Sequence, residues 1–166
     1  MRLILIIIIT GDLLVADELG NLFFKDRTGD TYRWKGENVS TSEVEAVVSN
    51  EAGYRDAVVF GVEIPNSEGR AGMVCILDSE KTLDIKTLGN SLKTALPSYA
   101  KPQFIRLLEK LDMTGTCKLK KLDLQKEGYD PNVVSDKIYY MNNKSGEYEL
   151  LTVELYEKVQ KNEIRF

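Results

Sequence analysis

The chain alternates between helical and strand-like spacings of apolar residues. Residues 41–51 place three valines on one helical face behind Ser and Thr residues that can cap the first turn. Residues 84–96 repeat leucine or isoleucine at helical intervals, and Pro97 ends that predicted helix. Continuous apolar runs predict buried strands at 57–64, 71–77 and 104–108. Alternating helices and strands of this kind indicate a small α/β layer.

The first 30 residues follow another pattern. Residues 12–26 predict a β-hairpin, because apolar residues flank a turn-forming segment at 17–21. The polar segment Asp26–Asp30 has no apolar face, which favours a linker or hinge. The apolar run that ends at Ile9 is shorter than a membrane span, and no signal-peptide cleavage pattern follows it. We interpret it as an accident of gene modelling or truncation, rather than as a buried strand or a membrane-dipping anchor.

The last third of the chain predicts smaller elements. A polar loop at 111–118 leads into a basic run that contains Lys118, Lys120 and Lys121. A short helix follows Asp123, and the pattern then predicts a Tyr-rich strand near 138–141 and an amphipathic helix over 152–161.

Composition narrows the possible chemistry. The 166 residues carry a net charge of -4 with typical apolar and charged fractions, so a nucleic-acid partner is not indicated. Histidine is absent, which excludes Ser-His-Asp and Cys-His catalysis within this chain. Cys75 and Cys117 stand far apart and form no CxxC pair, so we expect neither a disulfide framework nor a metal site.

Two clusters of residues are candidates for chemistry. In the first, Asp12 can accept the hydroxyls of a ribose and Arg27 can hold a sugar or phosphate oxygen. The alternative is that Asp12 caps a turn and Arg27 forms a surface ion pair. The second cluster is residues 112–121, where two threonines and a glycine accompany Lys118. The Lys118 ammonium can stabilise negative charge that develops on the oxygens of a phosphate or carboxylate. Because this segment lacks the Walker pattern, the alternative is a solvated basic turn.

A series of motifs resembles one known family. In order, they are TGDLLV, DRTGDTYRWKGENVSTSEVE, GVEIPNSEGRAGM, LPSYAKPQFIRLL and TGTCK. They resemble the C-terminal part of fatty-acid transport proteins and very-long-chain acyl-CoA synthetases, members of the adenylate-forming ligase superfamily. The resemblance covers nearly everything from Thr10 onward, and RWKGENVST is specific to this branch.

The resemblance implies an ATP-dependent fatty acid–CoA ligase that forms acyl-CoA through an acyl-adenylate. Its fold would be the small C-terminal lid domain of such an enzyme, an α/β (α+β) unit with a mixed sheet and flanking helices. The implied division is an apolar leader at 1–9, a hairpin remnant of the adenylation domain at 10–28, and the lid with a C-terminal extension at 29–166.

The resemblance also implies roles for single residues. Asp12 and Arg27 match the nucleotide-binding residues that reach the ribose, and Lys118 matches the catalytic lysine of adenylation. Gly29 and Asp30 correspond to the hinge about which the lid rotates. The residues that would line the CoA tunnel are Lys35, Gly36, Glu37 and Asn38.

The implied substrates are a fatty acid, ATP and CoA, with Mg²⁺ as the accompanying ion. No segment resembles the phosphate loop and acyl pocket of the large N-terminal adenylation domain, so we expect this polypeptide alone to be inactive. The full-length parent is expected at a membrane, on the cytosolic face of the endoplasmic reticulum or plasma membrane, and the fragment in the cytosol. The alternative is a non-catalytic truncated partner or a membrane-associated binding module.

Overall fold

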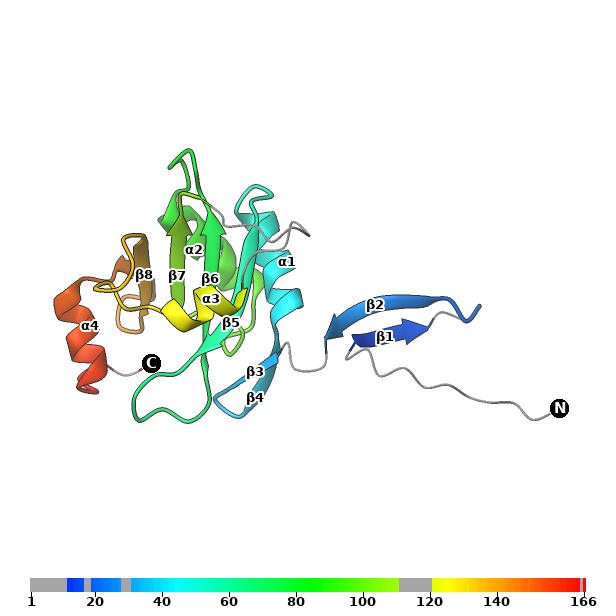
Figure 1. Cartoon of the computed structure of the whole chain (residues 1–166), viewed down its shortest axis with the longest axis horizontal. Coiled ribbons are helices and arrows are strands. Elements are labelled where there is room, and N and C mark those ends of the chain that lie inside the picture. The colour runs from blue at the N-terminus through cyan, green and yellow to red at the C-terminus, as the bar shows by residue number, and fades with distance from the viewer. Residues whose placement is uncertain (1–11, 17–18, 28–30, 111–120, 165) are drawn as a thin grey trace.

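The computed structural model describes residues 12–16, 19–27, 31–110, 121–164 and 166 (Figure 1). The strands are β1 Asp12–Ala16, β2 Leu22–Arg27, β3 Thr31–Trp34, β4 Glu37–Ser40, β5 Ala57–Val62, β6 Ala71–Leu77, β7 Phe104–Leu108, β8 Lys137–Asn142 and β9 Glu147–Leu150. The helices are α1 Thr41–Glu51, α2 Ile85–Ala95, α3 Lys121–Glu127 and α4 Val153–Gln160. All three strands and both longer helices predicted between residues 41 and 108 are confirmed.

A five-stranded mixed sheet forms the centre of the molecule. Its strand order is β5-β6-β7-β8-β9, with β6 and β7 parallel and the other neighbours antiparallel. Helix α2 provides the crossover that a parallel pair requires. The α/β class and the mixed sheet with flanking helices are therefore confirmed.

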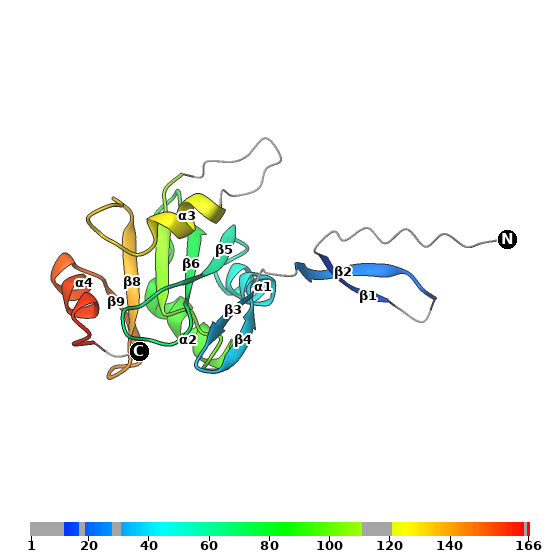
Figure 2. The ribbon, with the colours of Figure 1, turned by 60° about the horizontal axis from the view of Figure 1, so that its bottom comes forward.

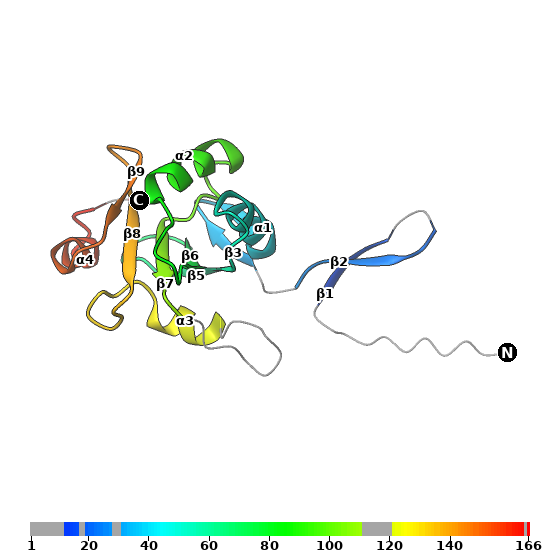
Figure 3. The same cartoon turned by 90° about the horizontal axis from the view of Figure 1, so that it is seen from above.

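Both faces of the sheet are covered, as Figure 3 shows for α1 and α2 on one side and α3 on the other. Phe104 of β7 stacks on Tyr129, which in turn meets Tyr156 of α4, so α4 is joined to the α3 side. Ile105, the next residue of β7, is also fully buried, although its side chain points to the opposite face. Cover on both faces explains why β5, β6 and β7 read as continuous apolar runs rather than as alternating ones.

Helix boundaries follow local capping chemistry. The Ser40 hydroxyl accepts the backbone N–H of Glu43 at 3.4 Å and begins α1, while the Asp84 carboxylate accepts the N–H of Lys86 at 3.1 Å and begins α2. Helix α2 ends at Ala95 because Leu96, the residue before Pro97, is extended. These starts and stops lie within one residue of the predicted ones.

Two hairpins precede the central sheet along the chain. Strands β1 and β2 pair as the predicted hairpin, but β2 continues through Asp26 and Arg27, where the sequence pattern suggested the start of the linker. The reason is that both residues still pair with β1, opposite Leu13 and Asp12. The β3–β4 hairpin was not predicted, because its four-residue strands are too short to establish a period.

The described residues contain no helix with the length and apolar character needed to cross a membrane.

Candidate functional site

The turn between β3 and β4 carries the residues expected to line the CoA tunnel. Lys35 and Gly36 form a two-residue connection with φ values of 50° and 86°. Such a turn needs positive φ at both positions, which glycine adopts without strain and lysine does not. Lys35, Gly36, Glu37 and Asn38 are all exposed, so the structure brings the four expected residues together at one accessible tip.

Buried aromatic residues hold this tip in place. Trp34, directly before the turn, is only 2% exposed, and the Lys35 ammonium lies 5.6 Å from the centre of its ring. The strand is also tied to the loop before β6, because the N–H of Arg70 donates to the carbonyl of Arg33 at 2.7 Å. The sequence carries only a weak signal for this hairpin: Tyr32 and Trp34 flank Arg33, but four residues are too few to establish a period.

Tyr32 anchors the other end of β3 on a glycine pair of the sheet. Gly61 of β5 and Gly72 of β6 are opposite one another, and a Cβ placed on Gly61 would lie 2.6 Å from the Cβ of Tyr32. Only glycine allows β3 to approach the sheet this closely. Burial raises the pKa of the Tyr32 hydroxyl, which is a neutral packing group at pH 7.

The two proposed ribose-binding residues are neighbours in the β1–β2 hairpin. Asp12 and Arg27 are directly opposite one another in the antiparallel register. The backbone thus brings together two residues that are fifteen positions apart in the sequence, as a shared site requires.

The other expected site residues, Lys118 and the hinge pair Gly29 and Asp30, lie outside the described residues. The described residue that follows Lys118 most closely in sequence is Lys121, the first residue of α3. Its ammonium donates to the Thr41 hydroxyl at 3.1 Å and lies 3.7 Å from the Glu45 carboxylate, both on α1. Sequence reasoning had placed Lys121 only in a basic run and missed this contact.

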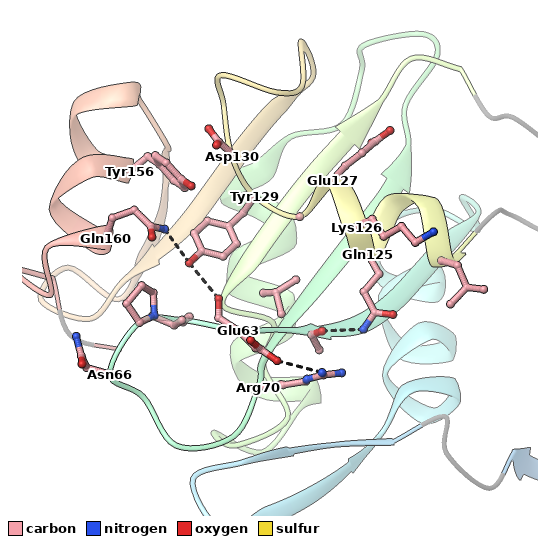
Figure 4. Close-up of a pocket in the computed structure, with 16 residues that line it drawn as sticks. Glu63, Asn66, Arg70, Gln125, Lys126, Glu127, Tyr129, Asp130, Tyr156 and Gln160 are labelled. Atoms are coloured by element: carbon pink, nitrogen blue, oxygen red, sulfur yellow. Dashed lines mark hydrogen bonds and ion pairs between the residues drawn. The ribbon is translucent and has the colours of Figure 1, made fainter.

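A groove of about 770 Å³ lies between the segment after β5 and helices α3 and α4 (Figure 4). Its polar groups largely satisfy one another: the Tyr129 hydroxyl donates to the carbonyl of Glu63 at 3.2 Å, and Arg70 pairs with the Glu63 carboxylate at 3.1 Å. Burial, reinforced by Asp130, raises the pKa of Tyr156 to about 12. Tyr156 is therefore a neutral hydrogen-bonding group of the groove at pH 7.

Neither a reactive thiol nor a metal cluster is present in the part of the chain that the structure describes. Burial raises the pKa of the Cys75 thiol to about 12, which keeps it protonated and unreactive at neutral pH. Across residues 12–16, 19–27, 31–110, 121–164 and 166, no three acidic, cysteine or histidine side chains gather as metal ligands.

Comparison with known proteins places this geometry in context. Residues 43–118 match the AMP-binding enzyme C-terminal domain. The chain is 50% identical over 140 residues to long-chain fatty acid transport protein 1 of Mus musculus. The aligned residues make up 84% of this chain and 22% of the mouse protein. Altogether, the chain spans about a quarter of the length of the curated relatives it matches.

Solved structures agree with the sequence relatives. The Mycobacterium tuberculosis fatty acyl CoA synthetase superposes with a TM-score of 0.62 at 25% identity, over 74% of this chain and 24% of the synthetase. The O-succinylbenzoate coenzyme A synthetase of Bacillus subtilis, in complex with AMP, superposes with a TM-score of 0.58 at 27% identity, over 70% of this chain and 23% of that enzyme. In both cases the matched part is a minor fraction of a larger protein.

Proposed function

Because this chain belongs to the fatty acid transport protein family of AMP-binding enzymes, we propose that it acts as the C-terminal domain of an ATP-dependent fatty acid–CoA ligase. The proposal rests above all on the β3–β4 tip, where an exposed Lys-Gly turn stands on a buried tryptophan. A rigid, accessible backbone turn suits the wall of a narrow channel. We infer that residues 29–166 form the mobile lid and that residues 10–28 belong with the larger domain.

In the first half-reaction, a carboxylate oxygen of the fatty acid attacks the α-phosphorus of ATP and pyrophosphate leaves. We assign Lys118 to this step, where its ammonium would stabilise the negative charge that develops on the reacting oxygens. Asp12 and Arg27 would hold the ribose, since their opposed positions allow a carboxylate and a guanidinium to act on one sugar. ATP must be bound chiefly by the larger domain that the relatives possess, and Mg²⁺ would accompany it there.

In the second half-reaction, the sulfur of CoA attacks the acyl carbonyl carbon, the thiol proton is lost, and AMP leaves. We assign the turn residues Lys35–Asn38 to the passage through which the pantetheine arm reaches the adenylate. The absence of a side chain on Gly36 would let the backbone approach that arm closely. Rotation about Gly29 and Asp30 would exchange the two faces between the half-reactions.

A chimeric enzyme tests the proposal. The matching C-terminal stretch of mouse long-chain fatty acid transport protein 1 would be replaced by this chain from Thr10 onward, and acyl-CoA formation would be measured from oleate, ATP and CoA. We expect an active chimera in which Lys118→Ala lowers acyl-adenylate formation by about 100-fold or more. Lys126→Ala is the matched control, because Lys126 is an exposed lysine of α3, and we expect it to leave the rate unchanged.

Two further measurements make the test decisive. Gly36→Val should slow transfer from a supplied acyl-adenylate to CoA while adenylate formation continues. An active chimera that tolerates Lys118→Ala would refute the role of that lysine, and a folded but inactive chimera would refute the assignment of the domain.

A further inference from the structure

Helix α3 is attached to the rest of the molecule mainly by polar contacts. None of its seven residues is buried, and Leu122 is 71% exposed. Leu124 is the partly buried apolar residue that packs against the core from this helix. A seven-residue helix is unstable in isolation, so specific side-chain ties must hold α3 in its place.

The first tie lies at the start of the helix. Lys121 reaches across to α1, where its ammonium donates to the buried Thr41 hydroxyl at 3.1 Å and lies 3.7 Å from a Glu45 carboxylate oxygen. The same oxygen of Glu45 accepts the backbone N–H of Val59 at 2.8 Å. Lys121 is therefore joined, through one carboxylate, to the outer edge of strand β5.

The second and third ties lie further along α3. The Gln125 amide donates to the carbonyl of Gly61 at 3.0 Å, again at the outer edge of β5. Glu127 lies 2.7 Å from a guanidinium nitrogen of Arg106, a buried residue that is also held by Asp136. These two contacts fix the middle and the end of α3. The contacts of the Lys121 side chain fix its start.

The position of Lys121 in the sequence gives its tie a functional consequence. Only two residues separate it from Lys118, and consecutive residues span at most about 3.6 Å each. Fixing the start of α3 through Lys121 therefore fixes one end of the short stretch of chain that leads to Lys118. Reaction rates fall steeply when a catalytic group is displaced by as little as an ångström.

We propose that Lys121 is a positioning residue for the adenylation half-reaction, because its contacts with Thr41 and Glu45 fix the start of the helix that follows Lys118. This inference rests on the proposed function for its catalytic part. The contact itself is a property of the chain alone. The two parts can therefore be tested separately.

Hydrogen exchange on the full 166-residue chain tests the contact. Lys121→Met removes the ammonium and keeps the length of the side chain, so we expect amides in segment 121–128 to exchange about tenfold faster. The Gly128 amide, which donates to the carbonyl of Leu124 at 3.0 Å, reports directly on helix opening. Exchange over residues 44–51 of α1 should stay unchanged, as should segment 121–128 in the matched variant Lys126→Met. Equal exchange in wild type and Lys121→Met would overturn the contact.

The two half-reactions, measured in the chimera, test the consequence. We expect Lys121→Met to lower kcat for acyl-adenylate formation by about 10- to 100-fold, with KM for ATP changed less than twofold. Transfer from a supplied acyl-adenylate to CoA should stay within twofold of wild type, and Lys121→Arg should restore most of the adenylation rate. A parallel fall in both half-reactions would show a merely structural role and overturn the proposal, as would an unaffected adenylation rate. If the unmutated chimera is inactive, the proposed function fails, while the exchange measurement still decides whether the contact holds α3.

Discussion

The β3–β4 hairpin and helix α3 meet the sheet at the same place, Gly61 of β5, and are held there by opposite means. Figures 2 and 3 show them on opposite sides of β5. In the hairpin, Tyr32, Trp34 and Val39 are buried, and none of them is more than 5% exposed. Helix α3 buries no residue, and it relies on hydrogen bonds and ion pairs from its first, fifth and seventh residues.

This difference teaches how one small domain can attach two segments, both assigned here a proposed role, with unequal firmness. Buried aromatic surface is removed from water in a single cooperative unit, so the hairpin moves only if the core opens. Each polar tie of α3 contributes only about 1 kcal/mol net, because water replaces the lost partner. The proposed tunnel tip is thus held rigidly. The contacts that hold α3, the helix after Lys118, can by contrast be lost one by one without opening the core.

The largest effect is expected from removing the aromatic anchor of the hairpin. Trp34→Ala should lower the free energy of unfolding by about 4 kcal/mol, since it leaves a cavity in the core. Urea denaturation followed by circular dichroism measures this, because the chain loses its only tryptophan. Trp34→Phe should cost far less, because the indole N–H has no hydrogen-bond partner among the described residues. Similar losses in the two variants would contradict the anchoring role.

A somewhat smaller effect is expected at the buried end of the α3 attachment. Arg106 is 5% exposed and binds Asp136 through two nitrogens, at 2.8 and 2.6 Å, so Arg106→Met should cost about 3 kcal/mol by leaving two carboxylates unpaired. Glu127→Gln should cost less than Asp136→Asn, because the Glu127 side chain is 42% exposed against 19% for Asp136. Denaturant titration of the three variants checks this order, and the reverse order would place the important partner on α3.

The contact at Gly61 should have a local rather than a global effect. Gln125→Leu removes the donor to the Gly61 carbonyl and should lower the free energy of unfolding by about 1 kcal/mol. Amide exchange in α3 should nevertheless accelerate, with Lys126→Leu as a control that leaves it unchanged. A loss of several kcal/mol in the free energy of unfolding of Gln125→Leu would show that α3 is part of the cooperative core. That result would contradict the contrast between α3 and the β3–β4 hairpin.

The smallest effect is expected at the cap of α2, a helix held by burial of four residues. Hydrogen bonds from Thr87 and from the Lys86 N–H lower the pKa of Asp84 below its ordinary value. A lowered pKa in the folded state means that the ionised cap stabilises the protein above the unfolded pKa, near 3.9, and that this contribution is lost as the pH falls. Asp84→Asn should therefore be slightly less stable than wild type at pH 7 and equally stable near pH 2. A difference that persists at pH 2 would contradict this origin.

Much of the fold follows from local sequence, because periodicity and caps act between near neighbours. The valines of 41–51 and the leucines of 84–96 predicted α1 and α2, and the apolar runs predicted β5, β6 and β7. Short elements were harder to predict from the sequence. Strands β3, β4 and β9 have four residues each, so packing rather than period decides them.

The sequence by itself determined the class of the fold, its main elements and, through resemblance, the family and the candidate residues Lys35–Asn38. Tertiary structure alone decided that Asp12 and Arg27 are opposed in one hairpin, that Trp34 supports the turn proposed to line the CoA tunnel, and that Lys121 binds α1 eighty residues away. The physical reason is the range of the interactions. Capping and periodicity are local, whereas a side chain's distant partner exists only once the sheet has brought the segments together.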